Sequence, residues 1–290
     1  MLDTLRQHLR GDHSIVTIVV VTFLFFNLTL ITIDSVASIV GLVDNPVLRK
    51  QIYFVWLIFQ FAIILPIQWI SLAQSCRFQI AAFKNYGGSI LTIVFSIVFT
   101  LLLFQYNFPG ESELASYWKI ARGVDNYHTD ISVENDVLML SGSLELGSAK
   151  KVALAIKANK VQKLELDLSE GQLYEAREIA RLVREQKLDV LVTRSCLAPC
   201  TLILASGRQR VVSEDAKIGF QSYKILYPDP RSRWFEEQEE KRDMNWLKQN
   251  DVSESFVFQT FYSRTNQNYW YPELPRLIEV GYIDQIINLK

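Results

Sequence analysis

The sequence predicts a mixed α/β domain that follows three transmembrane helices. Charge is distributed unevenly along the chain: residues 1–110 contain ten charged side chains, whereas residues 111–290 contain 51. The first part has three long stretches without Asp, Glu, Lys or Arg, and each is rich in Ile, Val, Leu and Phe. The second part alternates strand-like and helix-like segments, a pattern typical of βα units with parallel strands.

The three uncharged stretches predict membrane spans near residues 14–36, 52–72 and 88–107. A helix needs about 20 apolar residues to cross the hydrocarbon core of a bilayer. A cleaved signal peptide is a poorer interpretation, because the first stretch is too long, lacks a small-residue cleavage site and is followed by two more. Buried helices of a soluble core are a poorer interpretation, because three such apolar stretches occur within 110 residues. We therefore expect residues 1–110 to be an anchor whose partner is the lipid bilayer.

The charge of the chain helps to exclude one class of partner but does not indicate how the chain is oriented in the membrane. The formal net charge is -1, which argues against a nucleic-acid partner, since such proteins carry a basic patch or stripe. The predicted loops and flanks on the two sides of the membrane carry four basic residues each, so the positive-inside rule does not choose between them.

Residues 135–290 are expected to form the soluble domain, after a linker over 111–134. Alternating and helically spaced apolar residues predict its elements. They are, in order, a strand over 136–141, a helix that Ser148 can cap, a strand over 163–168, a helix over 172–186, a strand over 188–193, a short helix with Pro199 in its first turn and Gly207 at its end, and strands over 210–212 and 217–220.

Six short segments of the second part form a series. They are Leu140-Ser-Gly-Ser143, Leu166-Asp-Leu-Ser-Glu-Gly-Gln-Leu-Tyr-Glu-Ala176, Cys196-Leu-Ala-Pro-Cys-Thr201, Gly207-Arg-Gln-Arg210, Ala216-Lys-Ile-Gly-Phe-Gln221 and Glu279-Val-Gly-Tyr-Ile-Asp-Gln-Ile286. Their order and spacing resemble the Clp-protease/crotonase superfamily, in particular predicted periplasmic proteins of that fold. The resemblance covers residues 135–290 and implies a Clp/crotonase-like domain of repeated βα units, a ββα superhelix.

The resemblance also implies an active-site cleft whose chemical groups this sequence lacks. Active members use a Gly-Gly turn as an oxyanion hole, a serine at a helix N-terminus and a histidine base, because the serine needs a base and the oxyanion needs backbone donors. The Gly-Gly turn corresponds to Glu170 and Gly171. The serine position is Ala198, beside Pro199, and the histidine position is Gln221.

Two further observations point to lost catalysis. The acid of a Clp-type triad should fall at 266–269, where the sequence has no carboxylate. The chain contains three histidines, His8, His13 and His128, and none lies within 135–290. Histidine-based catalysis from within the domain is therefore excluded, and we expect a degenerate enzyme rather than an active one.

Non-standard nucleophiles remain as alternatives. Ser195 lies near the expected position but off register, with Lys217 as the nearest downstream lysine for a serine–lysine dyad. Cys200 is predicted in the first turn of a helix, where a thiolate is stabilised. Cys196 and Cys200 are expected to form a disulfide outside the cytoplasm or to be two buried thiols inside it, with catalysis or metal binding as further options. Two cysteines without histidine partners make a zinc site a poor interpretation, and no cofactor motif is present.

Two C-terminal segments keep alternatives open. Residues 231–250 are rich in charged and aromatic side chains. In the resembling fold this region mediates oligomer contacts, so the resemblance implies a homo-oligomer. A solvated helix is the alternative interpretation of the segment. Residues 256–271 are dense in aromatic side chains, which fits a ligand groove, a membrane-surface contact or the packing of the last helix into the core.

The first functional hypothesis is a membrane-anchored pseudoenzyme that binds or assembles peptides or membrane-protein partners. The resemblance favours the plasma (inner) membrane, crossed several times, with the C-terminal domain on the extracytoplasmic, periplasmic side. The alternative is a membrane-bound peptidase or hydrolase with a serine or cysteine nucleophile. An acyl-thioester enzyme of the crotonase kind is a third, and Glu170 argues against it, because a negative charge would lie where an oxyanion forms.

Overall fold

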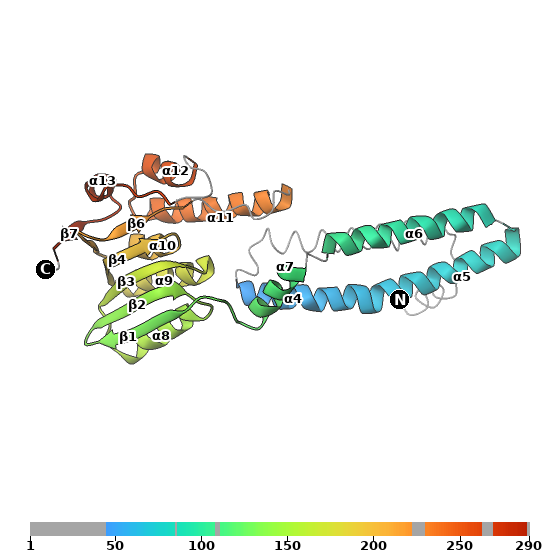
Figure 1. Ribbon diagram of the computed structural model, residues 1–290, viewed down its shortest axis with the longest axis horizontal. Helices are drawn as coiled ribbons and strands as arrows, with labels where there is room; N and C mark the ends of the chain where they lie inside the picture. Colours follow the sequence, from blue (N-terminus) through green and yellow to red (C-terminus); the bar gives the residue numbers. More distant parts are fainter. Residues whose placement is uncertain (1–44, 85, 108–110, 222–229, 263–268, 289–290) are drawn as a thin grey trace. The chain divides into compact units, whose positions relative to one another are not determined.

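The structure is a computed structural model that describes residues 45–84, 86–107, 111–221, 230–262 and 269–288 (Figure 1). The chain divides into two compact units, Met1–Arg122 and Gly123–Lys290. Helices and strands carry the labels of Figure 1.

The described part of the first unit is helical. It consists of α4 (Pro46–Ile58), a π-helical segment (Phe59–Ile64), α5 (Leu65–Phe83), α6 (Tyr86–Asn107) and α7 (Glu111–Ala121). α4 begins where Asn45 accepts hydrogen bonds from the backbone N–H groups of Val47 and Leu48, at 2.9 and 3.3 Å. α5 ends at Lys84, whose φ of 51° is left-handed and stops the helix.

The π-helical segment has a local cause in Pro66. Proline lacks the N–H that would bond one turn back, and its ring crowds the carbonyl of that turn. In the structure the backbone N–H of Leu65 donates to the carbonyl of Gln60, an i→i−5 bond that widens the helix just before the proline. The helix therefore continues through Pro66 instead of ending there.

One described helix, Val47–Phe83, is long and apolar enough to cross a membrane, and it contains the predicted span 52–72. The predicted span 88–107 lies in α6, whose apolar part Tyr86–Leu102 is by itself shorter than the roughly 20 residues that a bilayer core requires. The predicted span 14–36 lies outside the described residues. Among the described residues, one helix therefore meets both the length and the composition that a membrane span requires.

The expected linker over 111–134 is wrong in its first half, because α7 packs on α4. Tyr53 and Tyr117 meet edge to face with ring centroids 5.7 Å apart, and Phe54 and Trp118 do so at 5.2 Å. The ammonium group of Lys50 lies 3.1 Å from the centre of the Tyr117 ring, a cation–π contact. The pattern of aromatic residues in α7 thus serves helix packing within the first unit.

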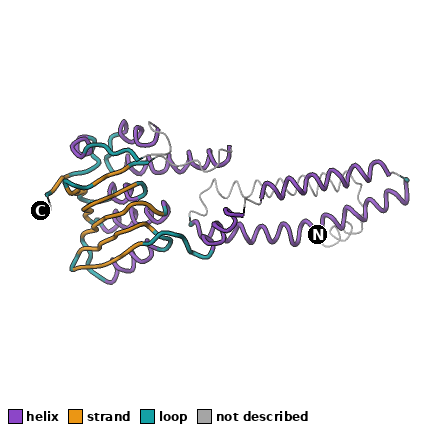
Figure 2. The backbone as a smooth tube through the Cα atoms, in the orientation of Figure 1, coloured by secondary structure: helices purple, strands orange, loops and turns teal. Residues whose placement is uncertain are grey.

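The second unit is built on one seven-stranded sheet (Figure 2). Its strands are β1 (Thr129–Glu134), β2 (Val137–Leu144), β3 (Lys163–Gly171), β4 (Asp189–Leu197), β5 (Arg210–Ser213), β6 (Lys217–Gly219) and β7 (Gln285–Ile287). The strand order is β1-β2-β3-β4-β5-β7, and β6 pairs with the end of β4 beyond β5. β1 and β2 are antiparallel, and the other pairs are parallel. This confirms the predicted α/β class.

The expected linker is wrong in its second half too, since residues 129–134 form β1. The strand alternates polar and apolar residues, and Ile131 and Val133 pack against the core. Its register with β2 runs from the pair Thr129 and Gly142 to the pair Glu134 and Val137. Four of the six positions of this strand are polar, because only one of its faces meets the core.

The helices of the second unit are α8 (Ser148–Ala158), α9 (Leu173–Gln186), α10 (Cys200–Ala205), α11 (Pro230–Gln249), α12 (Glu254–Tyr262) and α13 (Leu274–Glu279). α8, α9 and α10 lie behind the strands in Figure 1 and cover one face of the sheet, as right-handed crossovers between successive parallel strands require. On β3, Leu164, Leu166 and Leu168 are fully buried on this face. Lys163, Glu165 and Asp167 point to the opposite face and are half-buried.

The start of α8 differs from the prediction that Ser148 caps it. Ser148 is the first helical residue, and its hydroxyl donates to the carbonyl of Glu145 at 2.7 Å. The cap comes from another helix: the buried carboxylate of Glu175 on α9 accepts hydrogen bonds from the N–H groups of Gly147 and Ala149, at 2.9 and 2.8 Å. A negative charge at a helix N-terminus is favourable, so Glu175 joins α8 to α9.

The segment over 231–250 forms most of α11, and a buried ion pair holds α11 against α9. The guanidinium of Arg177 donates to both carboxylate oxygens of Asp243, at 2.8 and 2.7 Å, and also contacts Glu239. Burial raises the pKa of Asp243 above its usual range, although the hydrogen bonds from Arg177 act in the opposite direction. Trp246 donates from Nε1 to the hydroxyl of Ser206 at 2.9 Å. The oligomer contact predicted for this segment stays a prediction.

A second ion pair connects the chain after α13 to the sheet. Arg210, the first residue of β5, donates to Asp284 from its guanidinium and from its backbone N–H, at 2.6 to 3.1 Å. Burial alone would raise the pKa of Asp284, but these hydrogen bonds outweigh it and hold the pKa below its usual range. The charged form of Asp284 therefore stabilises the folded state.

The lowered pKa of Asp284 predicts a pH dependence of stability. A depressed folded-state pKa adds stability above the pKa of the unfolded chain, and this stability is lost as the pH falls through the folded value. Asp284→Asn should lower the free energy of unfolding at pH 6 by up to about 1 kcal/mol, because the pair is partly exposed. The difference from the wild type should shrink at pH 3, as measured by urea unfolding at both pH values.

The exposed Asp215 provides a charge-matched control, and Asp215→Asn should leave the pH dependence of the wild type in place. An equal gap between Asp284→Asn and wild type at pH 6 and pH 3 would contradict the role assigned to the Arg210–Asp284 pair.

Candidate functional site

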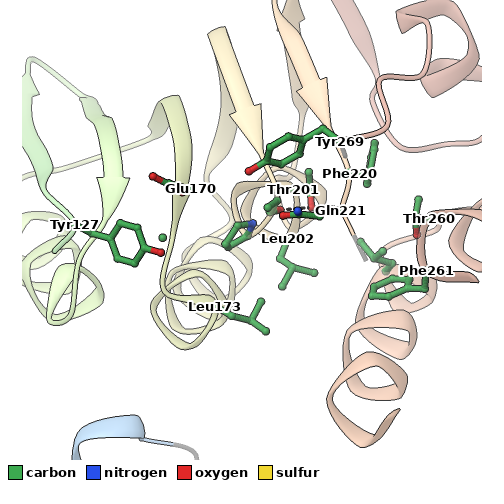
Figure 3. Close-up of a pocket in the computed structure, with 14 residues that line it drawn as sticks. Tyr127, Glu170, Leu173, Thr201, Leu202, Phe220, Gln221, Thr260, Phe261 and Tyr269 are labelled. Atoms are coloured by element: carbon green, nitrogen blue, oxygen red, sulfur yellow. Dashed lines mark hydrogen bonds between the residues drawn. The ribbon is translucent and has the colours of Figure 1, made fainter. Parts of the chain in front are cut away.

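A pocket of about 470 Å³ lies at the carboxyl ends of β3, β4 and β6, where ligands of parallel sheets commonly bind (Figure 3). Fourteen described residues line it: Tyr127, Glu170, Gly171, Leu173, Ala198, Pro199, Thr201, Leu202, Phe220, Gln221, Leu247, Thr260, Phe261 and Tyr269.

All five positions that the sequence places in the cleft lie on this pocket. Glu170 and Gly171 end β3, Ala198 and Pro199 follow β4, and Gln221 follows β6. Parallel register brings these positions together, because neighbouring strands end at the same edge of the sheet.

A sharp turn carries the chain from β4 into α10. Ala198 has a φ of 45°, a left-handed value that costs an alanine about 1 kcal/mol or more. Two hydrogen bonds hold the turn: the N–H of Ala198 donates to Gly219 at 2.8 Å, and the Thr201 hydroxyl donates to the carbonyl of Ala198 at 2.7 Å. A residue at such a strand–turn–helix corner points its side chain into the pocket, and here that side chain is a methyl group.

The residues around this corner offer little to an oxyanion. The residue after a nucleophile commonly supplies a backbone donor, and Pro199 has no N–H. Gly171 has a φ of 137°, and a Cβ there would lie 2.4 Å from the backbone nitrogen of Leu144, so only glycine fits. The preceding Glu170 adds a carboxylate to the same edge.

Glu170 is the only charged side chain among the described residues that line the pocket. Burial raises the pKa of Tyr127, and the negative charges of Glu170 and Asp125 raise it further. Burial also raises the pKa of Tyr269, followed by the charge of Glu170 and by Tyr271 and Tyr127. Both phenols are therefore neutral at pH 7, and Glu170 is within electrostatic reach of both.

The alternative nucleophiles lie elsewhere. Ser195 is on β4 but does not line the pocket, and its hydroxyl donates to Asp167 at 2.7 Å. Lys217 is its register partner on β6, and no hydrogen bond joins these two described residues. Cys196 and Cys200 form a disulfide, with a Cα separation of 5.2 Å, and both are buried. Neither cysteine is a thiol in this state.

The histidine at position 128 belongs to the second unit, Gly123–Lys290, but it does not line the pocket. His128 is 77% exposed and contacts Asp130 and Glu145 instead. His8 and His13 lie outside the described residues. The described ranges also contain no group of three or more His, Cys, Asp or Glu side chains placed to hold a metal ion.

Sequence reasoning missed the aromatic and apolar walls of the pocket. Tyr127 was assigned to the linker, although its position just before β1 brings it to the pocket. The aromatic segment over 256–271 divides between two environments. Phe256 and Trp270 pack against Phe220 in the core, with ring centroids 5.4 and 5.9 Å from it, whereas Phe261 and Tyr269 line the pocket. Aromatic density was the available signal, but it did not separate these roles.

Tyr282 supports the pocket from behind. Its ring is fully buried, and its hydroxyl donates to the backbone carbonyl of Thr201 in α10. Burial raises its pKa well above its usual range, so the hydroxyl stays a donor.

No protein-family model matches the chain, and no curated protein sequence matches it.

Proposed function

We propose that the protein is a membrane-anchored binding module whose Clp/crotonase-like domain has lost its catalytic groups. The observation that carries the proposal is the content of the pocket. Where the resemblance calls for a nucleophile, a base and the first glycine of an oxyanion turn, the pocket presents Ala198, Gln221 and Glu170.

Each replacement removes a step of acyl transfer. Alanine has no atom that attacks a carbonyl, and a glutamine amide does not take up a proton at neutral pH. Proline cannot donate a hydrogen bond from its backbone nitrogen, and the carboxylate of Glu170 would oppose a developing oxyanion. The pocket keeps the shape and the position of a site without the groups that perform chemistry.

The volume of the pocket supports a binding role. At about 470 Å³ it falls within the range of small-molecule and peptide side-chain sites, about 300–1,000 Å³. Its lining combines apolar side chains with a few polar groups, as ligand sites do. A peptide or a segment of a membrane-protein partner is the ligand class that we propose.

Several features support a multi-pass protein of the plasma (inner) membrane. The helix Val47–Phe83 has no charged side chain between Lys50 and Arg77. α6 adds a second apolar helix, and the aromatic groups between α4 and α7 suit a membrane–water interface. The disulfide between Cys196 and Cys200 supports an extracytoplasmic domain, because disulfides persist in oxidising compartments.

The function is tested with a fluorophosphonate activity probe on the full-length protein in dodecyl maltoside micelles. We expect no labelling above that of the heat-denatured sample. Labelling that heat abolishes and that disappears in Ser195→Ala would establish a serine nucleophile and contradict the proposal.

The orientation is tested with alkaline phosphatase fusions, since this enzyme is active only outside the cytoplasm. A fusion after residue 290 should be active, and one after Lys84, in the turn between α5 and α6, should be inactive. An inactive fusion after residue 290 at normal expression would refute the extracytoplasmic placement.

A further inference from the structure

We propose that the pocket selects a basic side chain, an arginine or a lysine of a peptide, and holds its charged end against Glu170. This inference rests on the proposed binding function and adds the chemical class of the ligand. Its elements are a carboxylate with no cationic partner among the described residues, two tyrosine rings and apolar side chains of the lining.

Glu170 has no cationic partner among the described residues, whereas three other acids of the domain are paired. Asp167 pairs with Arg194 at 2.6 Å, Asp189 with Arg208 at 2.8 Å, and Asp284 with Arg210 at 2.6 Å. The lining of the pocket contains no Lys, Arg or His in the described ranges. The site therefore carries a net negative charge, which attracts a cation and repels an anionic ligand.

Two tyrosines flank the space beside Glu170. Tyr127 and Tyr269 lie on opposite sides of the pocket in Figure 3, with their hydroxyl groups turned inward. Tyrosine rings attract cations through their faces, and guanidinium groups also stack on them. The influence of Glu170 on the pKa values of both phenols agrees with this proximity. A single carboxylate that shares a pocket with two aromatic rings suits an organic cation better than a metal ion, which prefers several oxygen ligands.

The floor of the pocket suits the rest of such a side chain. Leu202, Phe220 and Phe261 add apolar surface to the lining of the pocket. Lysine and arginine have alkyl stems that pack on apolar surface while the charged end reaches a polar group. The volume of about 470 Å³ leaves room for an apolar neighbour on the same peptide.

The test compares fluorescein-labelled hexapeptides that differ at one position: Ala-Ala-Leu-Arg-Ala-Ala and the same peptide with Gln or Glu in place of Arg. Binding to the full-length protein in dodecyl maltoside micelles is followed by fluorescence polarisation at 50 mM NaCl. We expect the Arg peptide to bind about tenfold more tightly than the Gln peptide, and the Glu peptide to bind more weakly still. The preference should decrease at 500 mM NaCl because salt screens an exposed charge.

Two variants assign the preference to the pocket. Glu170→Gln should bind the Arg and Gln peptides equally, whereas Glu134→Gln, which removes an exposed acid of β1 outside the pocket lining, should keep the wild-type preference. Equal binding of the Arg and Gln peptides to the wild type, no binding of either, or an unchanged preference in Glu170→Gln would overturn the inference. Mass spectrometry of the same samples separates the two proposals: cleaved peptide contradicts the non-catalytic function and leaves the charge preference standing.

Discussion

Asp243→Ala is expected to lower the free energy of unfolding by about 3 kcal/mol. The substitution leaves the guanidinium of Arg177 buried between α9 and α11 without its bidentate partner. Removing one member of a buried pair costs about 3–5 kcal/mol, and the remaining contact with Glu239 places this case at the lower end.

Urea unfolding of the full-length protein in micelles, followed by tryptophan fluorescence, measures this loss. Arg181→Ala breaks exposed ion pairs with Glu178 and Glu185 on the same helix and should cost less than about 1 kcal/mol. The double variant Arg177→Met, Asp243→Leu should recover much of the loss, since it removes both buried charges. A similar cost for Asp243→Ala and Arg181→Ala would show that burial does not govern the pair.

Gly171→Ala is expected to destabilise the domain by about 3 kcal/mol, from backbone strain together with steric overlap. The new Cβ would lie 2.4 Å from the backbone nitrogen and 2.6 Å from the carbonyl oxygen of Leu144. Because these are backbone atoms of the neighbouring strand β2, they cannot move aside without disrupting the pairing of β2 and β3. Thermal unfolding followed by circular dichroism measures the effect.

Gly147→Ala is the matched control for this prediction. Gly147 also has a positive φ, 91°, but a Cβ there would meet no atom within 4 Å. Its substitution should therefore cost only the backbone term, about 1 kcal/mol. Equal losses in the two variants would mean that the contact with Leu144 relaxes, contrary to the prediction.

The regular centre of the domain could be predicted from the sequence because its elements repeat a strong local pattern. β3 alternates leucines with polar residues, and α9 repeats buried positions at helical spacing, at Ala176, Ile179, Ala180 and Val183. Their predicted bounds differ from the observed ones by a few residues at most. β2, β3 and β4 lie side by side in the order of the chain, as successive βα units commonly do.

Elements that depend on distant partners could not be predicted in the same way. β1 contains four polar and two apolar positions, and it is a strand because it pairs with β2. The cap of α8 comes from Glu175, 26 to 28 residues away from the groups that it binds. Arg177 and Asp243 are 66 residues apart, and each alone resembles an ordinary charged residue of an exposed helix.

The candidate site shows the same division. The resemblance placed Glu170, Gly171, Ala198, Pro199 and Gln221 in one cleft, and they line one pocket. It did not indicate the aromatic residues opposite them, which come from segments before β1 and after α12. The sequence has no histidine within 135–290, and no histidine is among the described residues that line the pocket.

The buried disulfide must form before the core of the domain closes around it. The side chains of Cys196 and Cys200 are at most 1% exposed, and they lie in the core beneath the turn at Ala198. An oxidant that must reach the sulfur atoms therefore has access only while the core is still open, since thiol–disulfide exchange requires direct attack on sulfur. Once the core has closed, a reductant cannot reach the sulfur atoms either. The oxidation state of Cys196 and Cys200 in the folded domain is therefore set by the compartment in which the chain folded.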